Sequence, residues 1–295
     1  QNYHSAGIEN ISCWQVFWND PANLFGACSD VTAIRSDDGG ASWSYNYSGI
    51  TSNTVYRMAK NISNSTLYAA TSSIHDIYQS TRLQDAVLDA ANANGKVLFS
   101  ADNGASWQTL HDFGHPVYWI AMDPGNANRM YVSVVNHSAN AGGIYVSANI
   151  NLGASSTWTR IPPPGRTEGH PGNIQVLYDG TVLCSWNGRR NSAGAFTQSS
   201  GVFIYNPGLQ QWSDKSDQHM FYWTQDVVVD PNDATQNTWY AGVYNGWGGP
   251  PNGLGGLYKT TDRGSTWTRL LTLEGVTSVT FNPSDPDQLL VATEA

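Results

Sequence analysis

The sequence predicts an all-β fold built from repeated four-stranded antiparallel units. Three segments, at residues 36–43, 100–107 and 260–267, share the pattern Ser/Thr-x-Asp-x-Gly-x-x-Trp. Each follows a second recurring pattern, in which an apolar strand, a turn that is often Asx-Pro, and another strand succeed one another. Because an internal repeat constrains the architecture before any single residue is interpreted, these two patterns decide the fold class.

The Ser/Thr-x-Asp-x-Gly-x-x-Trp segment has the residue types of a β-hairpin turn. The Asp carboxylate can accept hydrogen bonds from the backbone N–H groups that follow it, and the Gly tolerates a positive φ. The Trp begins the next strand, where its ring can pack against a neighbouring unit. We therefore expect Trp43, Trp107 and Trp267 to be buried between units.

The strand–turn–strand pattern recurs along the chain, and its apolar residues alternate or run continuously, which is typical of strands and not of helices. Its copies cover residues 14–25, 55–69, 118–132, 174–184, 226–241 and 276–292. Degenerate forms of the Asp-containing turn end the third and fourth units, at residues 147–158 and 205–212. Each unit therefore holds four strands in roughly 50 residues, which indicates a β-propeller blade.

The last unit is unfinished, because the chain stops after the second strand of the sixth pattern. An unfinished blade exposes strand edges and half a core. We therefore expect residues 1–295 to form one propeller domain that is incomplete at its C-terminus. Further sequence or another chain would close a ring of about seven blades. Residues 245–256 are predicted to form a long loop, and residues 83–92 the one helix.

Composition excludes several classes of function. Charged residues make up 13% of the chain and aromatic residues 12%, which favours a packed fold over disorder. The net charge of −9 argues against nucleic-acid binding and against binding to anionic membranes. No apolar run approaches the roughly 18 residues of a membrane span, so we expect no membrane insertion.

Two of the three cysteines are expected to face each other. The midpoint between Cys13 and Cys28 falls at the Asp20-Pro21 turn, which places the two residues opposite each other on paired strands. Opposed strand positions bring Cβ atoms near disulfide reach. A disulfide in an exported protein and a pair of thiols are both consistent with this spacing. Cys184 is predicted to be a core strand residue.

The repeated turn resembles the Asp-box, or bacterial neuraminidase, repeat, and the resemblance extends over nearly the whole chain. Sialidases, xyloglucanases and sortilin-type receptors contain this repeat, so it implies a β-propeller and leaves the activity open. In that family the repeat is structural and lies on the face opposite the active site. The resemblance therefore implies a functional face made of the other loops.

That face should consist of the loops from the second to the third strand of each blade and of the crossings between blades. The loops are residues 30–33, 71–95, 136–143, 187–200 and 245–256, and the crossings are residues 45–54, 112–118, 166–173 and 215–224. Aromatic residues gather where the innermost strands begin and in the last loop, namely Trp14, Tyr118, Trp119, Tyr222, Trp223 and Trp247. Such rings bind the faces of sugars. The alternative is that they pack between blades.

Asp30 is the first candidate for catalysis. Its segment, Ser29-Asp30-Val31-Thr32-Ala33, is similar to the Thr-Asp-Val/Ile-Gly-Gly segment of xyloglucanase-type propellers, in which the Asp is catalytic. The match is partial, because Thr32 and Ala33 replace the two glycines. In those enzymes the partner carboxylate belongs to a second propeller, which this chain does not contain. The alternative is that Asp30 caps a turn.

A glycosidase needs a second carboxyl near Asp30, within about 10 Å. Asp226 begins the innermost strand of the fifth blade and is the partner predicted first, and Glu168 is the second choice. Asp76 and Asp217 lie on the same predicted face. The sequence motif singles out none of the four.

Other chemistries fit less well. Sialidase activity requires an arginine cluster and an Arg-Ile-Pro segment before the first repeat, whereas Arg160-Ile161-Pro162 follows two repeats. The adjacent Arg189 and Arg190 could bind an anionic sugar, but two arginines in a row on such a loop are expected to be solvated. His75 and four other histidines fall on the functional face, where a His could act as an acid or base in a lyase. No pattern of ligands indicates a metal or another cofactor.

The sequence thus predicts an exported protein, secreted or on the cell surface, that acts on or binds a polysaccharide and resembles a glycoside hydrolase. The predicted catalytic residues are Asp30 and Asp226. The predicted glycan-binding residues are Trp14, Trp119, Tyr222, Trp223, Trp247 and His75. The alternative is a non-catalytic module for glycan binding, adhesion or assembly within a larger protein.

Overall fold

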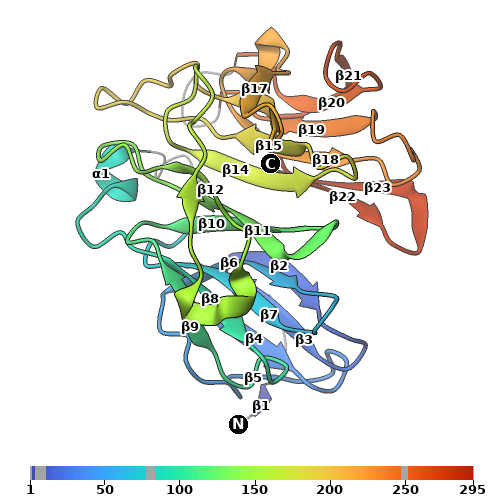
Figure 1. The fold of residues 1–295 in the computed structure, drawn as a ribbon. Coiled ribbons are helices and arrows are strands. Elements are labelled where there is room, and N and C mark those ends of the chain that lie inside the picture. Colours follow the sequence, from blue (N-terminus) through green and yellow to red (C-terminus); the bar gives the residue numbers. More distant parts are fainter. Residues whose placement is uncertain (1, 4–10, 78–83, 247–251, 295) are drawn as a thin grey trace. The chain divides into compact units, whose positions relative to one another are not determined.

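The chain is almost wholly β-structure in a computed structural model that describes residues 2–3, 11–77, 84–246 and 252–294 (Figure 1). Among these residues there are five antiparallel sheets, each built on four strands that are consecutive in the chain, and one of the five has an additional edge strand. A sixth sheet has two strands. The predicted all-β class and its four-stranded units are thereby confirmed. The chain divides into two compact units, residues 1–77 with 86–161 and residues 78–85 with 162–295.

The first unit contains three blades. The first blade consists of β2 (Cys13–Trp18), β3 (Leu24–Cys28), β4 (Ala33–Ser36) and β5 (Trp43–Ser44), with β1 (Asn2–Tyr3) paired to β5 at the outer edge. The second consists of β6 (Thr54–Lys60), β7 (Leu67–Ser72), β8 (Lys96–Ser100) and β9 (Gln108–Asp112). The third consists of β10 (Val117–Asp123), β11 (Asn126–Val134), β12 (Gly143–Ser147) and β13 (Thr159–Arg160), with the 3-10 helix η1 (Ile150–Ser155) before β13.

The second unit contains two blades and a hairpin. The fourth blade consists of β14 (Pro171–Val176), β15 (Val182–Trp186), β16 (Gly201–Asn206) and β17 (Gln211–Asp214). After the 3-10 helix η2 (Gln218–Met220), the fifth consists of β18 (Thr224–Val229), β19 (Trp239–Val243), β20 (Gly256–Thr260) and β21 (Thr268–Thr272). The hairpin of β22 (Gly275–Asn282) and β23 (Asp285–Glu294) confirms that the last predicted pattern forms two paired strands. The helix predicted over residues 83–92 is confirmed only for the four residues of α1 (Asp85–Leu88).

Burial explains the composition of the strands. The second strands β3 and β7 are buried at every position, because residues on both of their faces are covered, and they read as continuous small and apolar runs. The outer strand β21 is exposed at every position. Within the first unit, Phe25, Met58, Leu67 and Trp107 belong to one hydrophobic cluster that joins the first two blades. The sheets are therefore held together by apolar side chains from consecutive blades.

The repeated turns share one set of hydrogen bonds. In the first, the Ser36 hydroxyl donates to Asp38 Oδ1, and Asp38 accepts from the Ser42 N–H at 2.8 Å and from the Ser42 hydroxyl at 2.6 Å. The same contacts recur around Asp102 and Asp262 within 0.1 Å. In the degenerate third copy Asn149 Oδ1 takes the place of the carboxylate. The pattern found in the sequence is therefore a conserved local geometry within the chain.

The tryptophans of these turns differ in burial. Trp107 is 4% exposed, and its ring meets Phe25 of the first blade edge-on at 6.1 Å. Trp267 is half-buried against Trp239, and its Nε1 donates to the Lys215 carbonyl at 2.7 Å. Trp43 is only half-buried. The predicted burial is confirmed in full for Trp107 and in part for the other two.

The innermost strands of all five blades carry a register irregularity at their start. It falls between Cys13 and Gln15 in β2, between Val55 and Arg57 in β6, and between Val117 and Trp119 in β10, and β14 and β18 have the equivalent shift. A bulge re-aims the side chain of the extra residue and is common beside functional sites. In the first unit the extra residues are Trp14, Tyr56 and Tyr118.

Candidate functional site

Asp30 lies in a tight turn directly after β3. Its φ of +64° and the φ of +68° at Thr32 are rare for residues with a Cβ, which marks the turn as strained. The Asp30 side chain is 60% exposed. Asn53 Nδ2 donates to Asp30 Oδ1 at 3.2 Å, and the Asp30 N–H donates back to Asn53 Oδ1 at 3.4 Å. The strained turn therefore presents a carboxylate whose orientation is set by the start of the next blade.

His75 and Asp76 lie beside Asp30, in the segment that follows β7. The His75 Nδ1 is 3.6 Å from Asp30 Oδ1 and 3.5 Å from Asp76 Oδ2. The two carboxylate oxygens are therefore no more than about 7 Å apart, which meets the predicted condition that a second carboxyl lies near Asp30. Asp76 also has a positive φ, of +50°. The structure thus brings two carboxyls and an imidazole together from two loops.

Ser29 connects this cluster to the predicted aromatic residues. Its hydroxyl oxygen accepts from the Trp14 Nε1 at 2.8 Å and from the Asp76 N–H at 3.2 Å. The half-buried Trp14 ring meets Tyr56 edge-on at 4.9 Å and Tyr118 at 6.3 Å. The bulges at the starts of β2, β6 and β10 therefore aim their extra residues at one another.

Tyr56 fixes the segment that carries the imidazole and the second carboxyl. Its hydroxyl donates to the Ile74 carbonyl at 2.7 Å and accepts from the Ile77 N–H at 2.8 Å. Burial raises the pKa of Tyr56 well above its ordinary value, so the hydroxyl stays protonated and both bonds persist over the physiological range. His75 and Asp76 are thus held between two anchored backbone groups.

Trp119 follows the third bulge and is half-buried. The guanidinium of Arg57 lies over its ring at 4.0 Å, and the Tyr118 ring is 6.0 Å away. One face of Trp119 is therefore engaged by a cation, which contributes about 0.5–2 kcal/mol in such pairs. Trp247, also predicted to bind glycan, lies outside the described residues.

Asp226 is a buried structural carboxylate of the second unit. It is 7% exposed and accepts hydrogen bonds from Asn173 Nδ2 at 2.5 Å and from the Val279 N–H at 2.9 Å. These bonds tie β18 to β14 and to β22 within that unit. The pairing of Asp226 with Asp30, which belongs to the first unit, stays a prediction.

The other predicted aromatic residues of the second unit differ in exposure. Trp223 is fully buried, stacks on Tyr244 at 4.1 Å and donates from Nε1 to Asn187 and Gln225, so its ring offers no face to a ligand. Tyr222 is half-buried and lies against Phe196 at 4.1 Å. Burial raises the pKa of Tyr222 to about 12. Trp223 is therefore a packing residue, which is the alternative to glycan binding that the sequence left open. Part of the Tyr222 side chain remains accessible.

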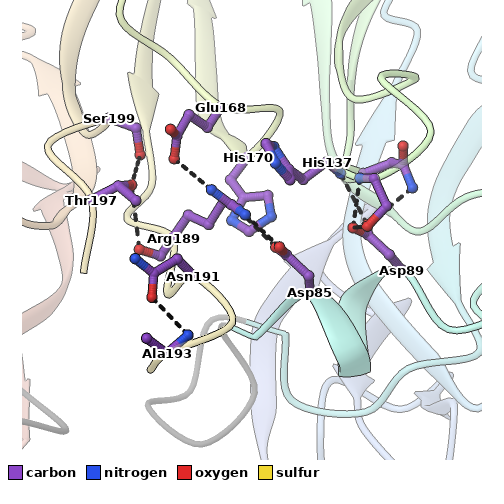
Figure 2. A network of polar contacts seen from close by, with 12 residues as sticks. Asp85, Asp89, His137, Glu168, His170, Arg189, Asn191, Ala193, Thr197 and Ser199 are labelled. Carbon is purple, nitrogen blue, oxygen red and sulfur yellow. Dashed lines mark hydrogen bonds and ion pairs between the residues drawn. The ribbon is translucent and has the colours of Figure 1, made fainter. Parts of the chain in front are cut away.

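Arg189 forms an ion-pair cluster that sequence reasoning missed. It is 8% exposed, forms a two-pronged pair with Asp85, and donates from Nη1 to Glu168 Oε2 at 2.9 Å (Figure 2). The hydrogen bond to Asp85 is the main cause that raises the pKa of Arg189. The expectation that Arg189 is solvated is therefore wrong, because two carboxylates draw the guanidinium inward. The same pair engages Glu168, the second-choice catalytic partner.

Asp89, in the first unit, has a comparable role in its own loop. It accepts from the N–H of His137 at 2.9 Å and from the Ser138 N–H and hydroxyl at 2.7 and 2.6 Å (Figure 2). Asp89 thus anchors the loop after β11.

Within the described part of the chain no group of three or more His, Cys, Asp or Glu side chains could hold a metal ion. No helix in that part is long and apolar enough to cross a membrane.

Cys13 and Cys28 are register partners of β2 and β3, as their spacing predicts. Both are free thiols in the structure, and Cys184 is buried in β15, also as predicted. A hydrogen bond with Cys28 lowers the pKa of Cys13 to about 7, while the same contact and burial raise the pKa of Cys28. The shifts favour the thiolate form at the exposed Cys13 over the thiolate form at the buried Cys28.

Comparison with solved structures identifies the fold. A GH74 xyloglucanase from Xanthomonas campestris superposes with a TM-score of 0.64 at 16% identity, over 93% of this chain and 42% of that chain. An ancestral GH74 enzyme matches with a TM-score of 0.53 at 13% identity, over 93% and 42% of the two chains. YCF48 bound to D1 peptide matches with a TM-score of 0.57 at 13% identity, over 98% and 78%. The chain has the β-propeller fold.

At these identities the likeness shows the fold alone. The chain spans about 42% of the length of the GH74 enzymes that it matches. No protein-family model and no curated protein matches the sequence. The fold by itself therefore leaves the activity open.

Proposed function

We propose that this protein is a carbohydrate-active propeller that binds a polysaccharide at the Asp30 region and cleaves its glycosidic bonds, with Asp30 as one of the two carboxyls. The observation that carries the proposal is the exposed Asp30 carboxylate on a strained turn, 3.6 Å from His75 and oriented by Asn53. Strain of this kind concentrates at functional sites. The likeness to two GH74 enzymes supports the substrate class.

The glycan would lie along the loops that carry Asp30 and His75, with the accessible parts of Trp14 and Trp119 beside it. Flat rings with polar edges suit the alternating faces of sugars. An exported location follows from the proposed substrate, since structural polysaccharides lie outside the cell. Neither a metal nor another cofactor is part of the proposal, because glycosidases of this type work with carboxyls alone.

Hydrolysis and binding are tested separately. Xyloglucan and a panel of neutral polysaccharides are incubated with the wild type and with Asp30→Asn, and new reducing ends are counted. Binding is followed by retardation in gels that contain each polysaccharide. We expect Asp30→Asn to lose hydrolysis by about 10²- to 10⁴-fold, the usual contribution of a positioned acid or base. Because the amide keeps the shape of the side chain, retardation should be unchanged.

The control is Asp37→Asn, which removes an exposed carboxylate from the first repeated turn and should leave both measurements unchanged. A wild type that neither hydrolyses nor is retarded by any polysaccharide of the panel would refute the proposed function.

A second candidate is a non-catalytic binding or assembly module. The likeness to YCF48, which covers 78% of that chain, favours it. In that case Asp30 caps its turn, and a wild type that binds glycan without cleaving it is the expected result.

A further inference from the structure

We propose that Asp76 supplies the second carboxyl of the reaction, so that both catalytic carboxyls come from the first unit, and that His75 between them is a positioning residue. This inference rests on the proposed hydrolysis. It differs from the pairing predicted from the sequence, in which Asp226 is the partner. It also differs from the arrangement implied by the resemblance, in which the partner lies in a second propeller.

The separation of the two carboxyls fits the chemistry. Asp30 Oδ1 and Asp76 Oδ2 each lie within 3.6 Å of one atom, His75 Nδ1, so they are at most about 7 Å apart. Carboxyls about 5–5.5 Å apart serve retention, and those about 6.5–9.5 Å apart serve inversion. The distance limit admits the whole retaining range and the lower end of the inverting range.

The remaining acceptor of Asp76 supports a ligand at this position. The Asp76 side chain is 15% exposed, and its Oδ1 is buried without a hydrogen-bond donor from any residue that the structure describes. A buried carboxylate oxygen is normally paired, so each exception requires an explanation. A sugar hydroxyl, entering past the exposed Asp30, would supply the missing donor.

The three other carboxyls named by sequence reasoning belong to the second unit and are already engaged, Asp217 through its contacts with His219. Asp226 is 7% exposed and accepts hydrogen bonds from three elements of its own unit. Glu168 accepts from Arg189 at 2.9 Å. Removing either partner would cost stability, because a buried polar group would lose its hydrogen bond. Within the described part of the first unit, Asp76 combines proximity to Asp30 with an open acceptor.

The backbone gives independent support. Asp30 and Asp76 both adopt a positive φ, of +64° and +50°, although both have a Cβ. Their two turns are joined through Ser29, whose hydroxyl accepts from the Asp76 N–H at 3.2 Å. Two strained turns that are fixed to each other and aim their carboxyls at one imidazole are expected of a site in which geometry matters.

The step is hydrolysis of a glycosidic bond. One carboxyl donates its proton to the leaving oxygen as the bond from the anomeric carbon to that oxygen breaks. Water supplies the hydroxyl that ends on the anomeric carbon, directly or after a glycosyl–carboxylate intermediate, and its proton returns to a carboxyl. Protons and oxygen balance with water as the one co-substrate. His75 Nδ1 lies 3.6 Å from Asp30 Oδ1 and 3.5 Å from Asp76 Oδ2, and the ring takes no part in breaking or forming either bond.

The test compares Asp76→Asn with Asp30→Asn and with the control Asp37→Asn. We expect both cluster variants to lose hydrolysis by about 10²- to 10⁴-fold while retardation by the polysaccharide is unchanged. An aryl glycoside with an acidic leaving group distinguishes the two roles, since it departs without a proton. The variant that lacks the acid should recover activity on it, and the other should not.

The variant His75→Gln tests the positioning role. It should lower turnover less than either carboxyl variant and should shift the pH profile of turnover, which a purely structural change would leave in place. If Asp76→Asn does not fold, the size-matched pair Asp76→Glu and Asp76→Gln replaces it. Asp76→Glu, which keeps a carboxylate in a shifted position, should then retain at least about tenfold more activity than Asp76→Gln, which has an amide.

The outcomes separate this inference from the proposed function. Wild-type hydrolysis that Asp30→Asn removes and Asp76→Asn does not would overturn the role of Asp76 and leave the proposed function standing. A wild type that binds polysaccharide and cleaves none would overturn the role of Asp76 together with the catalytic part of the proposed function.

Discussion

Asp102 accepts both the backbone N–H of Ser106, at 2.9 Å, and its hydroxyl, at 2.6 Å, so that one carboxylate closes the turn between β8 and β9. The same relationship joins Asp38 to Ser42 and Asp262 to Thr266. Hydrogen bonds to an ionised acceptor are stronger than neutral ones. These three turns therefore depend on the charge of their Asp.

This dependence predicts loss of stability in acid. Hydrogen bonds from the following residues lower the pKa of Asp38, Asp102 and Asp262 from the ordinary 3.8 to about 2. Between these values the unfolded chain binds more protons than the folded chain, so stability is present above pH 4 and falls as the pH drops through 2. The midpoint of thermal unfolding should decline over that window. A variant with Asn at all three positions should show a flatter decline and a lower midpoint at pH 6, and equal slopes would contradict the prediction.

Trp107 should dominate the contact between the first two blades. It is 4% exposed, meets Phe25 at 6.1 Å and belongs to the cluster that includes Met58 and Leu67. Trp107→Ala should lower the free energy of unfolding by about 3–5 kcal/mol, as measured in denaturant. The matched control is Trp18→Ala at a position 61% exposed, which should change it by less than about 0.5 kcal/mol. Equal effects would show that the turn Trp is not a packing element.

The architecture could be predicted from the sequence because it is encoded locally. Strand alternation, Asx-Pro turns and the Asp-containing turns each depend on residues within about ten positions of one another. The register of Cys13 with Cys28 followed from the centre of one turn. Aromatic residues such as Trp14 and Tyr118 also mark in the sequence where the innermost strands begin, which is where the bulges lie.

The side-chain contacts around Asp30 and Arg189 could not be predicted from the sequence in the same way. His75 meets Asp30 across 45 residues, at turns that contain the positive-φ residues Asp30 and Asp76. Arg189 meets Asp85 across 104 residues. Neither strain nor an ion pair between distant loops leaves a periodic signal. The sequence could therefore indicate Asp30 and His75 as separate candidate residues. It could not show that Asp76 lies beside Asp30 or that Arg189 is buried, because both depend on the folded structure.

Cys13 and Cys28 should form a disulfide on mild oxidation. They are opposed on β2 and β3, and a pKa of about 7 makes Cys13 partly thiolate at neutral pH. With oxidised glutathione as the acceptor of two electrons, the two thiols should bond and leave Cys184 alone reactive to a thiol reagent in denaturant. A closed loop of about 15 residues should add about 3 kcal/mol to stability. Cys28→Ser is the control, and three titratable thiols after oxidation of the wild type would contradict the prediction.

Arg189→Met should destabilise the second unit, because it leaves Asp85 and Glu168 without their shared cation. Breaking a fully buried pair costs about 3–5 kcal/mol, and we expect about 2–3 kcal/mol here because the two carboxylates stay 22% and 33% exposed. Adding Asp85→Asn and Glu168→Gln to Arg189→Met should recover part of the loss, since the uncompensated charges are then removed. Unfolding in denaturant measures all of these variants. An Arg189→Met protein as stable as the wild type would mean that the guanidinium is solvated, as its place in the sequence suggested, and that the two carboxylates do not depend on it.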